Sequence, residues 1–258
     1  MVLAPTSEIS TKNLDFAVEV IRKRLDDLGI RDASVMRQDK TIEVIVPGAP
    51  DREMPVVRRR GLLELYDLQG DLAKASLDEQ GFPRASRERL EERPGTVLVT
   101  CRPRARYCPG VDEEPQATYY YLFEDGPELT GDDIELKGTR QDFDPTVGEP
   151  VVLMQFTPAG AKKFEDVTLK LAERGRVLYN RHGGERWIYM QQFAIVLDRE
   201  IRSAPTIDFQ ENPAGIPGDT GAQIAGIGSV REAKELALVL RNGALPIEFR
   251  IISTETRG

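Results

Sequence analysis

The sequence predicts an α+β fold, and three observations support this class. Residues 12–28 repeat apolar side chains at the spacing of an amphipathic helix. Residues 41–46 alternate apolar and polar side chains, which is typical of a strand with one buried face. The first part of the chain then runs helix, strand, strand, helix, strand, and this order mixes both kinds of element within one unit.

The N-terminal elements follow from local signals. The apolar face of the first helix consists of Leu14, Ala17, Val18, Ile21, Leu25 and Leu28. Ser10 or Thr11 can cap its start, and Gly29 can end it in the left-handed conformation. Strands are expected at 33–37, 41–46 and 62–68, with a short helix at 51–60. If residues 2–4 are a further strand, the order becomes β-α-β-β-α-β, the ferredoxin-like pattern.

The rest of the chain has clear elements separated by polar segments. Residues 69–117 form an irregular excursion with one helix near 84–92 and one strand around Val97-Leu98-Val99. Further strands are expected at 119–123, 134–142, 151–156, 193–197, 201–207, 222–227 and 247–251. Thr157-Pro158 starts a helix that should end near Gly175, and residues 176–191 then form a polar hairpin tip. Ser229 and Glu232 form a capping box that starts the last helix.

These elements suggest a domain organisation. We expect a ferredoxin-like base at residues 1–125, an inserted α+β head at 126–228, and a C-terminal helix and strand at 229–258 that return to the base. Residues 69–124 are an insertion within the base.

Composition narrows the function classes. The 258 residues carry a formal net charge of −8, which argues against a duplex nucleic-acid binder. No stretch approaches the roughly 18 apolar residues that span a bilayer. Taken literally this indicates a cytosolic protein, although a piece cut between two membrane helices would look the same. Residues 84–106 hold seven arginines against three glutamates, and residues 111–150 hold twelve acidic residues. These two charged segments are either solvated faces or an electrostatic docking surface.

The two cysteines, Cys101 and Cys108, enclose a short turn-rich loop. Their spacing does not fit a tetrahedral zinc site, which needs further ligands. A disulfide is therefore the predicted role, and it implies an oxidising compartment.

No catalytic constellation emerges. His182 is the only histidine and is expected in a polar loop, so no Ser-His-Asp or Cys-His pair is indicated. The glycines at 226 and 228 precede a helix, where an anion could bind, but a tight strand-to-helix crossing explains them better. Asp132-Asp133 and Asp142/Asp144 could bind calcium, although acidic surface loops are far commoner. We therefore expect no enzyme activity, no cofactor and no metal, and a binding or mechanical module instead.

Three segments resemble the SecD family of protein-export membrane proteins. In the first, I-R-K-R-L-D-D-L-G at 21–29 leads to I-E-V-I-V-P-G at 42–48. The second is A-I-V-L-D at 194–198 through S-A-P at 203–205, and the third runs from 225 to G-A-L-P at 243–246. With 156–168, these cover about half of the chain. The motif residues are Asp198, Pro205, Gly226, Gly243, Leu245 and Pro246.

The resemblance implies a first extracytoplasmic (periplasmic) domain of a membrane protein, with a ferredoxin-like base and an inserted head. It implies that the head binds translocating preprotein and assists export driven by the proton-motive force. The implied partners are SecF, the SecYEG channel and unfolded secretory polypeptide, with no nucleic acid and with membrane contact only through helices outside this sequence. The alternative is a structural scaffold that positions partner subunits without touching substrate.

The sequence departs from the family at three places. Arg199 stands where the family often has glycine, residues 69–124 form an insertion that we do not match to the family, and residues 175–191 are expected to be longer than usual. Candidate polypeptide contacts are apolar positions of the head, for which core packing is the other interpretation: Phe193, Ile201, Ile207 and Phe209.

Overall fold

The computed structural model describes residues 1–47, 54–87, 90, 92–103, 108–111, 115–124 and 126–254. The mixed α+β class predicted from the sequence is confirmed. The longer helices are α1 (Thr11–Asp27), α4 (Pro158–His182) and α5 (Val230–Arg241), and α2 (Met54–Arg58) and α3 (Leu68–Asp71) are short. Within the described ranges, none of the helices combines the length and the apolar character that crossing a membrane requires.

The strands form sheets of four, seven and three strands. In chain order they are β1 (Val2–Pro5), β2 (Ser34–Gln38), β3 (Thr41–Ile45), β4 (Leu63–Asp67), β5 (Thr96–Cys101), β6 (Tyr119–Glu124), β7 (Leu129–Thr130), β8 (Ile134–Phe143), β9 (Pro150–Phe156), β10 (Gln191–Leu197), β11 (Glu200–Ser203), β12 (Thr206–Ile207), β13 (Ala222–Ile224) and β14 (Phe249–Ser253).

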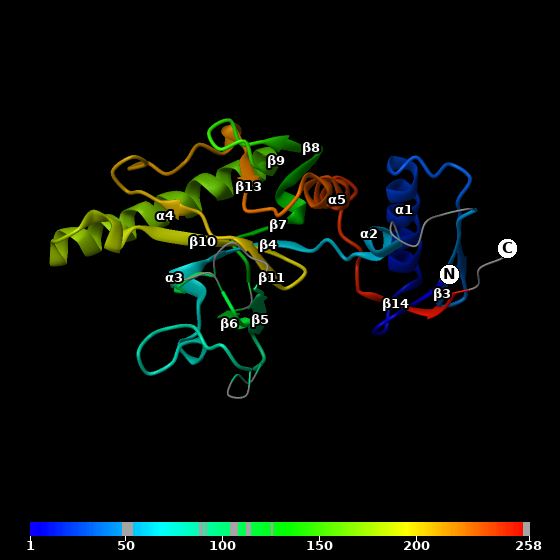
Figure 1. Cartoon of the computed structure of the whole chain (residues 1–258), viewed down its shortest axis with the longest axis horizontal. Coiled ribbons are helices and arrows are strands. Elements are labelled where there is room, and N and C mark those ends of the chain that lie inside the picture. The colour runs from blue at the N-terminus through cyan, green and yellow to red at the C-terminus, as the bar shows by residue number, and fades with distance from the viewer. Residues whose placement is uncertain are drawn as a thin grey trace.

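One unit, which we call the base, is the four-stranded sheet β14-β1-β3-β2 with α1 on one face. β3 lies between β1 and β2 and is antiparallel to both, as in a split β-α-β unit. The buried face of α1 packs on this sheet because its apolar residues recur every three or four positions. Figure 1 shows the base at one end of the molecule together with both termini.

The remainder, which we call the head (residues 63–241), is built around the seven-stranded sheet β6-β5-β11-β10-β4-β7, with β12 paired to β10. Strand β10 is buried on both faces. Phe193, Ile195 and Leu197 point into a core shared with α4, α5 and the sheet β13-β9-β8. Ala194 and Val196 point into a second core beneath β5 and β6. This period of two follows from the strand geometry.

This arrangement differs from the expected domain boundaries. Strand β4 does not complete the base; it pairs with β10 across residues 63–67 and 193–197. All five of its residues are buried, as expected for a strand that is covered on both faces. The base takes its fourth strand from the C-terminal end, where β14 pairs with β1. Helix α5 packs mainly in the head core, through Ala233, Leu236, Ala237 and Leu240.

Helix α4 also differs from its prediction, because it continues beyond Gly175 to His182. Gly175 is helical and does not end the helix. A Cβ atom built there would lie 2.6 Å from the carbonyl oxygen of Tyr189, so the glycine permits a close approach of residues 186–189 to the helix. The end comes at Gly183 and Gly184, with φ of 65° and 97°.

The helix expected near 84–92 is not formed by the residues described there. Arg84 makes an isolated bridge to Tyr120, and residues 88, 89 and 91 lie outside the described residues. Of the helix expected at 51–60, residues 51–53 also lie outside the described residues, α2 occupies 54–58, and residues 59–60 are not helical.

Cys101 and Cys108 form a disulfide, and both sulfur-bearing side chains are buried in the core beneath β5 and β6. Replacing both cysteines by serine is expected to lower the free energy of unfolding by about 2.5 kcal/mol, because an eight-residue loop is then no longer closed in the unfolded chain. Urea titration of both proteins would measure this difference. An unchanged midpoint would show that the cross-link does not stabilise the head.

Candidate functional site

The base and the head are joined by two linkers that run beside each other. Residues 59–62 lead from α2 into β4, and residues 242–248 lead from α5 into β14 (Figure 1). The backbone N–H of Leu245 donates to the carbonyl oxygen of Arg60 at 2.7 Å, which ties the two linkers together. We call these two linkers and the side chains that bind them the junction.

Arg24 of α1 is the central side chain of the junction and is fully buried. One terminal nitrogen, Nη1, donates to the carbonyl oxygens of Val57 (3.1 Å) and Arg59. The other, Nη2, donates to Gly243 (2.7 Å) and Arg60 (3.4 Å). One guanidinium from the base therefore holds both linkers.

Burial lowers the pKa of Arg24 to about 10, since desolvation disfavours the charged form. The carboxylate of Asp198 opposes this shift, and the nearby charge of Arg59 reinforces it. Arg24 is therefore still protonated at neutral pH and keeps all its donors.

Asp198 binds the first linker from the head side. It follows β10, where its Oδ1 accepts from the backbone N–H of Leu62 at 2.8 Å and its Oδ2 pairs with Arg59 Nε at 3.1 Å. Asp198 and Arg199 both have a positive φ, 52° and 63°. Arg199 thus adopts without a glycine the conformation that glycine favours, and its side chain pairs with Glu64 at 3.3 Å.

Each linker contains a glycine in the left-handed conformation, Gly61 (φ 76°) and Gly243 (φ 81°). At Gly61 a side chain has no room, because a Cβ atom would lie 2.5 Å from Val239 Cγ1 and 3.1 Å from Arg24 Nη2. The close contact between linker, α1 and α5 therefore requires glycine there.

A further contact joins α1 directly to the end of α5. Asp27 Oδ2 accepts from Arg241 Nη2 and from Asn242 Nδ2, each at 2.8 Å. Partial burial alone would raise the pKa of Asp27, but the hydrogen bonds from Asn242 and Arg241 lower it overall. Leu238 and Val239 of α5 pack beside Val56, which adds an apolar contact to this polar one.

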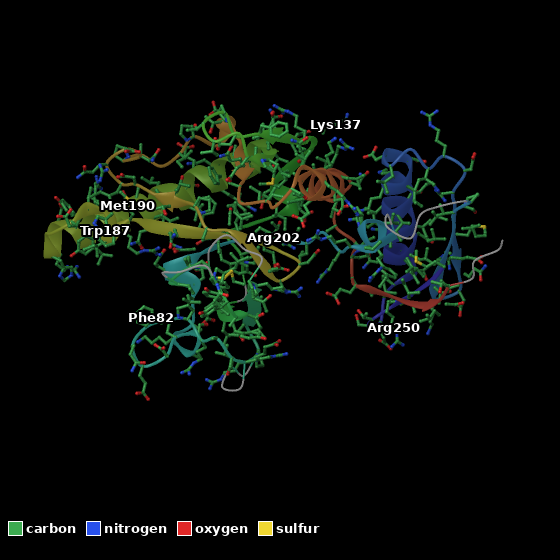
Figure 2. The ribbon with its side chains drawn as sticks, in the orientation of Figure 1. Phe82, Lys137, Trp187, Met190, Arg202 and Arg250 are labelled. Atoms are coloured by element: carbon green, nitrogen blue, oxygen red, sulfur yellow. A yellow bond between two sulfur atoms is a disulfide. The ribbon has the colours of Figure 1, made fainter. Side chains whose placement is uncertain are left out.

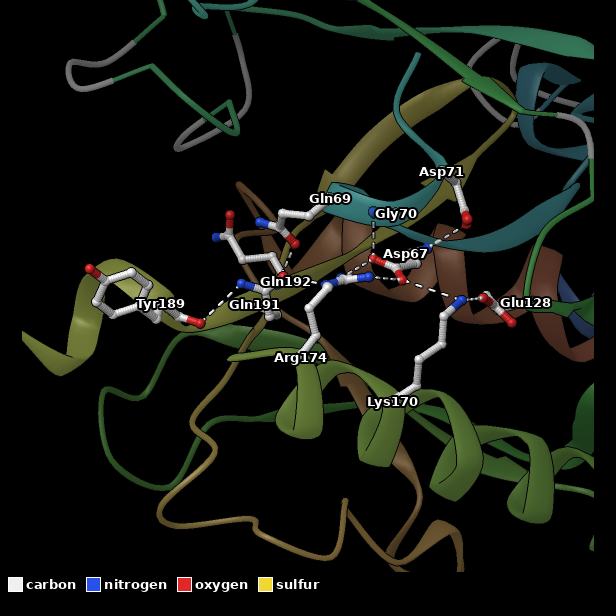
Figure 3. A network of polar contacts seen from close by, with 10 residues as sticks. All are labelled: Asp67, Gln69, Gly70, Asp71, Glu128, Lys170, Arg174, Tyr189, Gln191 and Gln192. Carbon is white, nitrogen blue, oxygen red and sulfur yellow. Dashed lines mark hydrogen bonds and ion pairs between the residues drawn. The ribbon is translucent and has the colours of Figure 1, made fainter. Parts of the chain in front are cut away.

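A second polar network fastens α4 to the central sheet of the head (Figure 3). The buried carboxylate of Asp67 accepts two hydrogen bonds from Arg174, at 2.7 and 2.5 Å, and one from the N–H of Gly70. Lys170 bridges Asp67 (3.4 Å) and Glu128 (2.6 Å). Burial would raise the pKa of Asp67, but Arg174 holds it below its usual value.

Asp67, Asp71 and Glu128 bring three carboxylates within 4.8 Å of one another. Lys170 and Arg174 place two positive charges beside these three carboxylates. Two of the acids considered for calcium also have structural partners: Asp133 pairs with Lys163 at 2.8 Å, and Asp144 accepts from the N–H groups of Thr146 and Val147.

The four candidate polypeptide contacts lie in the core. Phe193, Ile207 and Phe209 belong to the core that α4 covers, and Ile201 belongs to the core on the other face of the sheet. None is more than 4% exposed, so none can touch a polypeptide in this conformation. His182 lies in the last turn of α4, with its ring stacked at 6.2 Å from that of Tyr189.

The junction brings together all three segments that carry the family resemblance. Arg24 and Asp27 come from the first, Asp198 from the second, and Gly243 and Leu245 from the third. Pro246 follows in the same linker, whereas Pro205 lies after β11 and Gly226 precedes α5. Part of each of the three motif segments thus meets the others at the junction.

Most of the head matches a known family. The family described as SecDF, P1 head subdomain, matches residues 106–247, which is more than half of the chain. The chain belongs to the SecDF family. The matched region contains the second and third motif segments and most of the head.

Individual relatives extend the match to nearly the whole sequence. The SecD subunit of the protein translocase from Rhodobacter capsulatus is 31% identical over 252 residues, covering 96% of this chain and 36% of that protein. The SecDF subunit of Thermus thermophilus is 30% identical and is covered over 28% of its length. The chain therefore spans well under half the length of these relatives.

Two solved structures share the fold. One, described as SecDF in a super-membrane-facing form, superposes with a TM-score of 0.64 at 26% identity, over 98% of this chain and 29% of that one. The other, described as a membrane component SecDF that enhances protein export, has a TM-score of 0.64 at 29% identity over 100% of this chain and 99% of that one.

Sequence reasoning missed Arg24 as a functional residue, although a signal was present. Arg24 lies three positions after Ile21 and next to Leu25, on the apolar face of α1. A cation at core spacing in an otherwise regular helix indicates a buried polar contact, because an unpaired charge is too costly to bury.

Proposed function

We propose that the chain is an extracytoplasmic domain of a protein translocase subunit, in which the head handles translocating polypeptide and the junction couples the head to the base. The observation that supports this is the convergence of the three SecD-like segments on the junction. The relatives are named as protein translocase subunits, and protein translocation is therefore the process that we propose for this chain.

Location and partners follow from the same proposal. The domain lies on the periplasmic or outer face of the cell membrane and works beside SecF and the SecYEG channel, supporting export that depends on the proton-motive force. The buried disulfide is consistent with an oxidising compartment.

The head has to offer polypeptide a surface other than the four buried candidate residues. Extended polypeptide can add to the edge of a sheet through main-chain hydrogen bonds. Strand β13 is an edge strand of the three-stranded sheet, and this favours strand addition as the mode of contact.

The decisive experiment restrains the junction in the full-length subunit. Cysteines at Asp27 and Asn242, whose side chains touch across α1 and α5, would be joined by a short thiol cross-linker. We expect export of a secretory protein to fall to the level of cells without the subunit, because the head can no longer move against the base.

A matched pair controls for the cross-link itself. Cysteines at Asp15 and Arg37, which pair at 2.6 Å within the base, are joined in the same way and should leave export unchanged. Full export with the junction cross-linked would favour the alternative, a scaffold that positions partner subunits. Site-specific cross-linking from β13 to a stalled preprotein tests substrate contact separately, and its absence would exclude polypeptide binding at that edge.

A further inference from the structure

The short turn that follows α4 carries the chain's only tryptophan, and this side chain is exposed. Trp187 is 69% exposed, and the adjacent Ile188 is 54% exposed. Both belong to the short 3₁₀ turn Arg186–Tyr189 that follows α4. Figures 1 and 2 show this turn at the end of the molecule opposite the base, with Trp187 and Met190 labelled there. We call residues 183–190 the tip.

The tip is a built structure and not a frayed helix end. Arg186 Nη2 pairs with the buried Asp208 at 3.1 Å, and its Nη1 donates to Gln210. The ring of Tyr189 contacts Tyr179 at 6.1 Å and His182 at 6.2 Å. The contacts of Arg186 and Tyr189 thus hold the turn in place, while the side chains of Trp187 and Ile188 face solvent.

The tip lies within residues 175–191, the segment that is expected from the sequence to be longer than is usual in the family. It adds little to the core, since none of residues 186–189 is buried. Fixing two large apolar side chains in water is unfavourable unless they find an apolar environment elsewhere.

Shape and charge indicate what that environment is. A tryptophan that lines a groove is mostly covered by its neighbours, whereas this ring projects. Tryptophan favours the boundary between lipid headgroups and acyl chains, where its ring is apolar and its N–H can still bond. Arg181 is exposed in the last turn of α4, and no ion pair to it is formed within the described part of the chain, so it is available to a lipid phosphate.

The acids near the tip limit the electrostatic contribution. Arg176 is loosely paired with Glu173 at 3.9 Å, Arg186 also approaches Glu211 at 4.0 Å, and Glu185 precedes the turn. Positive and negative charges near the tip are close to balanced. Insertion of the apolar side chains therefore contributes more to binding a surface than electrostatic attraction to anionic groups does.

We propose that the tip docks on a phospholipid bilayer, with Trp187 and Ile188 inserted at the interface and Arg181 at the headgroups. Two side chains give weak partitioning on their own, and docking therefore depends on tethering to the membrane, which raises the effective concentration.

The single tryptophan makes the test direct, because all indole emission comes from Trp187. The whole chain is attached by a flexible N-terminal histidine tag to vesicles that contain nickel-chelating lipid and phosphatidylglycerol, with brominated or unbrominated acyl chains. We expect the emission to shift to shorter wavelength on attachment and to be quenched by the brominated lipid. Ile188→Asp should abolish both effects, and Arg181→Glu should weaken them.

Val147→Asp is the matched control, since Val147 is 63% exposed in the hairpin between β8 and β9. It should behave like the unmodified chain. Emission that stays unshifted and unquenched on tethered vesicles would overturn the proposal. So would a shift caused by an unfolded secretory polypeptide in the absence of vesicles together with no vesicle effect, because the tip would then be a polypeptide site.

Discussion

Replacing Arg24 with methionine is expected to lower the free energy of unfolding by about 3 kcal/mol, since several carbonyl groups at the junction lose a charged donor at once. The methionine fills a similar volume, so the loss reports on hydrogen bonds and not on a cavity. The side chain binds Arg59 and Arg60 on one linker and Gly243 on the other, and it also binds Val57 in α2. Chemical denaturation followed by circular dichroism measures the difference.

Two further substitutions separate charge from geometry. Lys23→Met removes a cation from the exposed face of the same helix and should change stability by less than about 0.5 kcal/mol. Arg24→Lys keeps the charge but has a single nitrogen in place of a planar fork, so it should recover only part of the loss. A methionine variant as stable as the unmodified chain would contradict the assigned role of Arg24.

Asp67→Asn should be the second large effect, with a loss of about 3 kcal/mol at pH 7 because Arg174 and Lys170 lose their buried counter-charge. The pKa of Asp67 is lowered in the folded state, so its contribution is complete above the unfolded value of about 4. It is lost as the pH falls through the folded pKa. The difference between the two proteins should therefore be constant at neutral pH and shrink in acid.

Asp71→Asn is the matched control one helical turn away. Burial, together with the nearby charges of Asp67 and Glu128, raises the pKa of Asp71, so its ionised form is disfavoured in the folded state. An amide oxygen can still accept from the N–H of Asp67, as Asp71 Oδ2 does at 2.8 Å. The variant should be as stable as the unmodified chain or slightly more so at pH 7. Equal losses for both substitutions would contradict the proposed roles.

Local sequence signals predicted helices and strands well where the repeat of apolar residues was long and unbroken. Helix α1 and strand β10 lie where their apolar repeats indicated, and Ser229 caps α5 by accepting from the N–H of Glu232 at 3.2 Å. The pairing of strands that are distant in the sequence was harder to predict. Alternating apolar and polar residues show that a strand has a buried face, but they do not show which strand lies beside it. β4 was therefore assigned to the wrong sheet. Gly175 was mistaken for a helix end because close packing and helix termination both select glycine.

The junction could be predicted only in part. The motif residues around Asp198 and Gly243 were identified from the resemblance, but their meeting point depends on contacts more than a hundred residues apart, such as Arg24 to Gly243. Apolar residues chosen as surface contacts proved to be core, since hydrophobicity by itself favours burial.

The length of α4 gives small changes at the junction a large effect elsewhere. Its 25 residues span about 37 Å, and Figure 1 shows that they run from the neighbourhood of α5 to the far end of the head. Under the proposed coupling of head and base, the head would rotate about the two linkers and α4 would act as a lever arm. A rotation of about 10° would displace the far end by roughly 6 Å, about the length of one helical turn. In that case the hydrogen bonds of Arg24 to the two linkers would affect the position of the most distant part of the molecule.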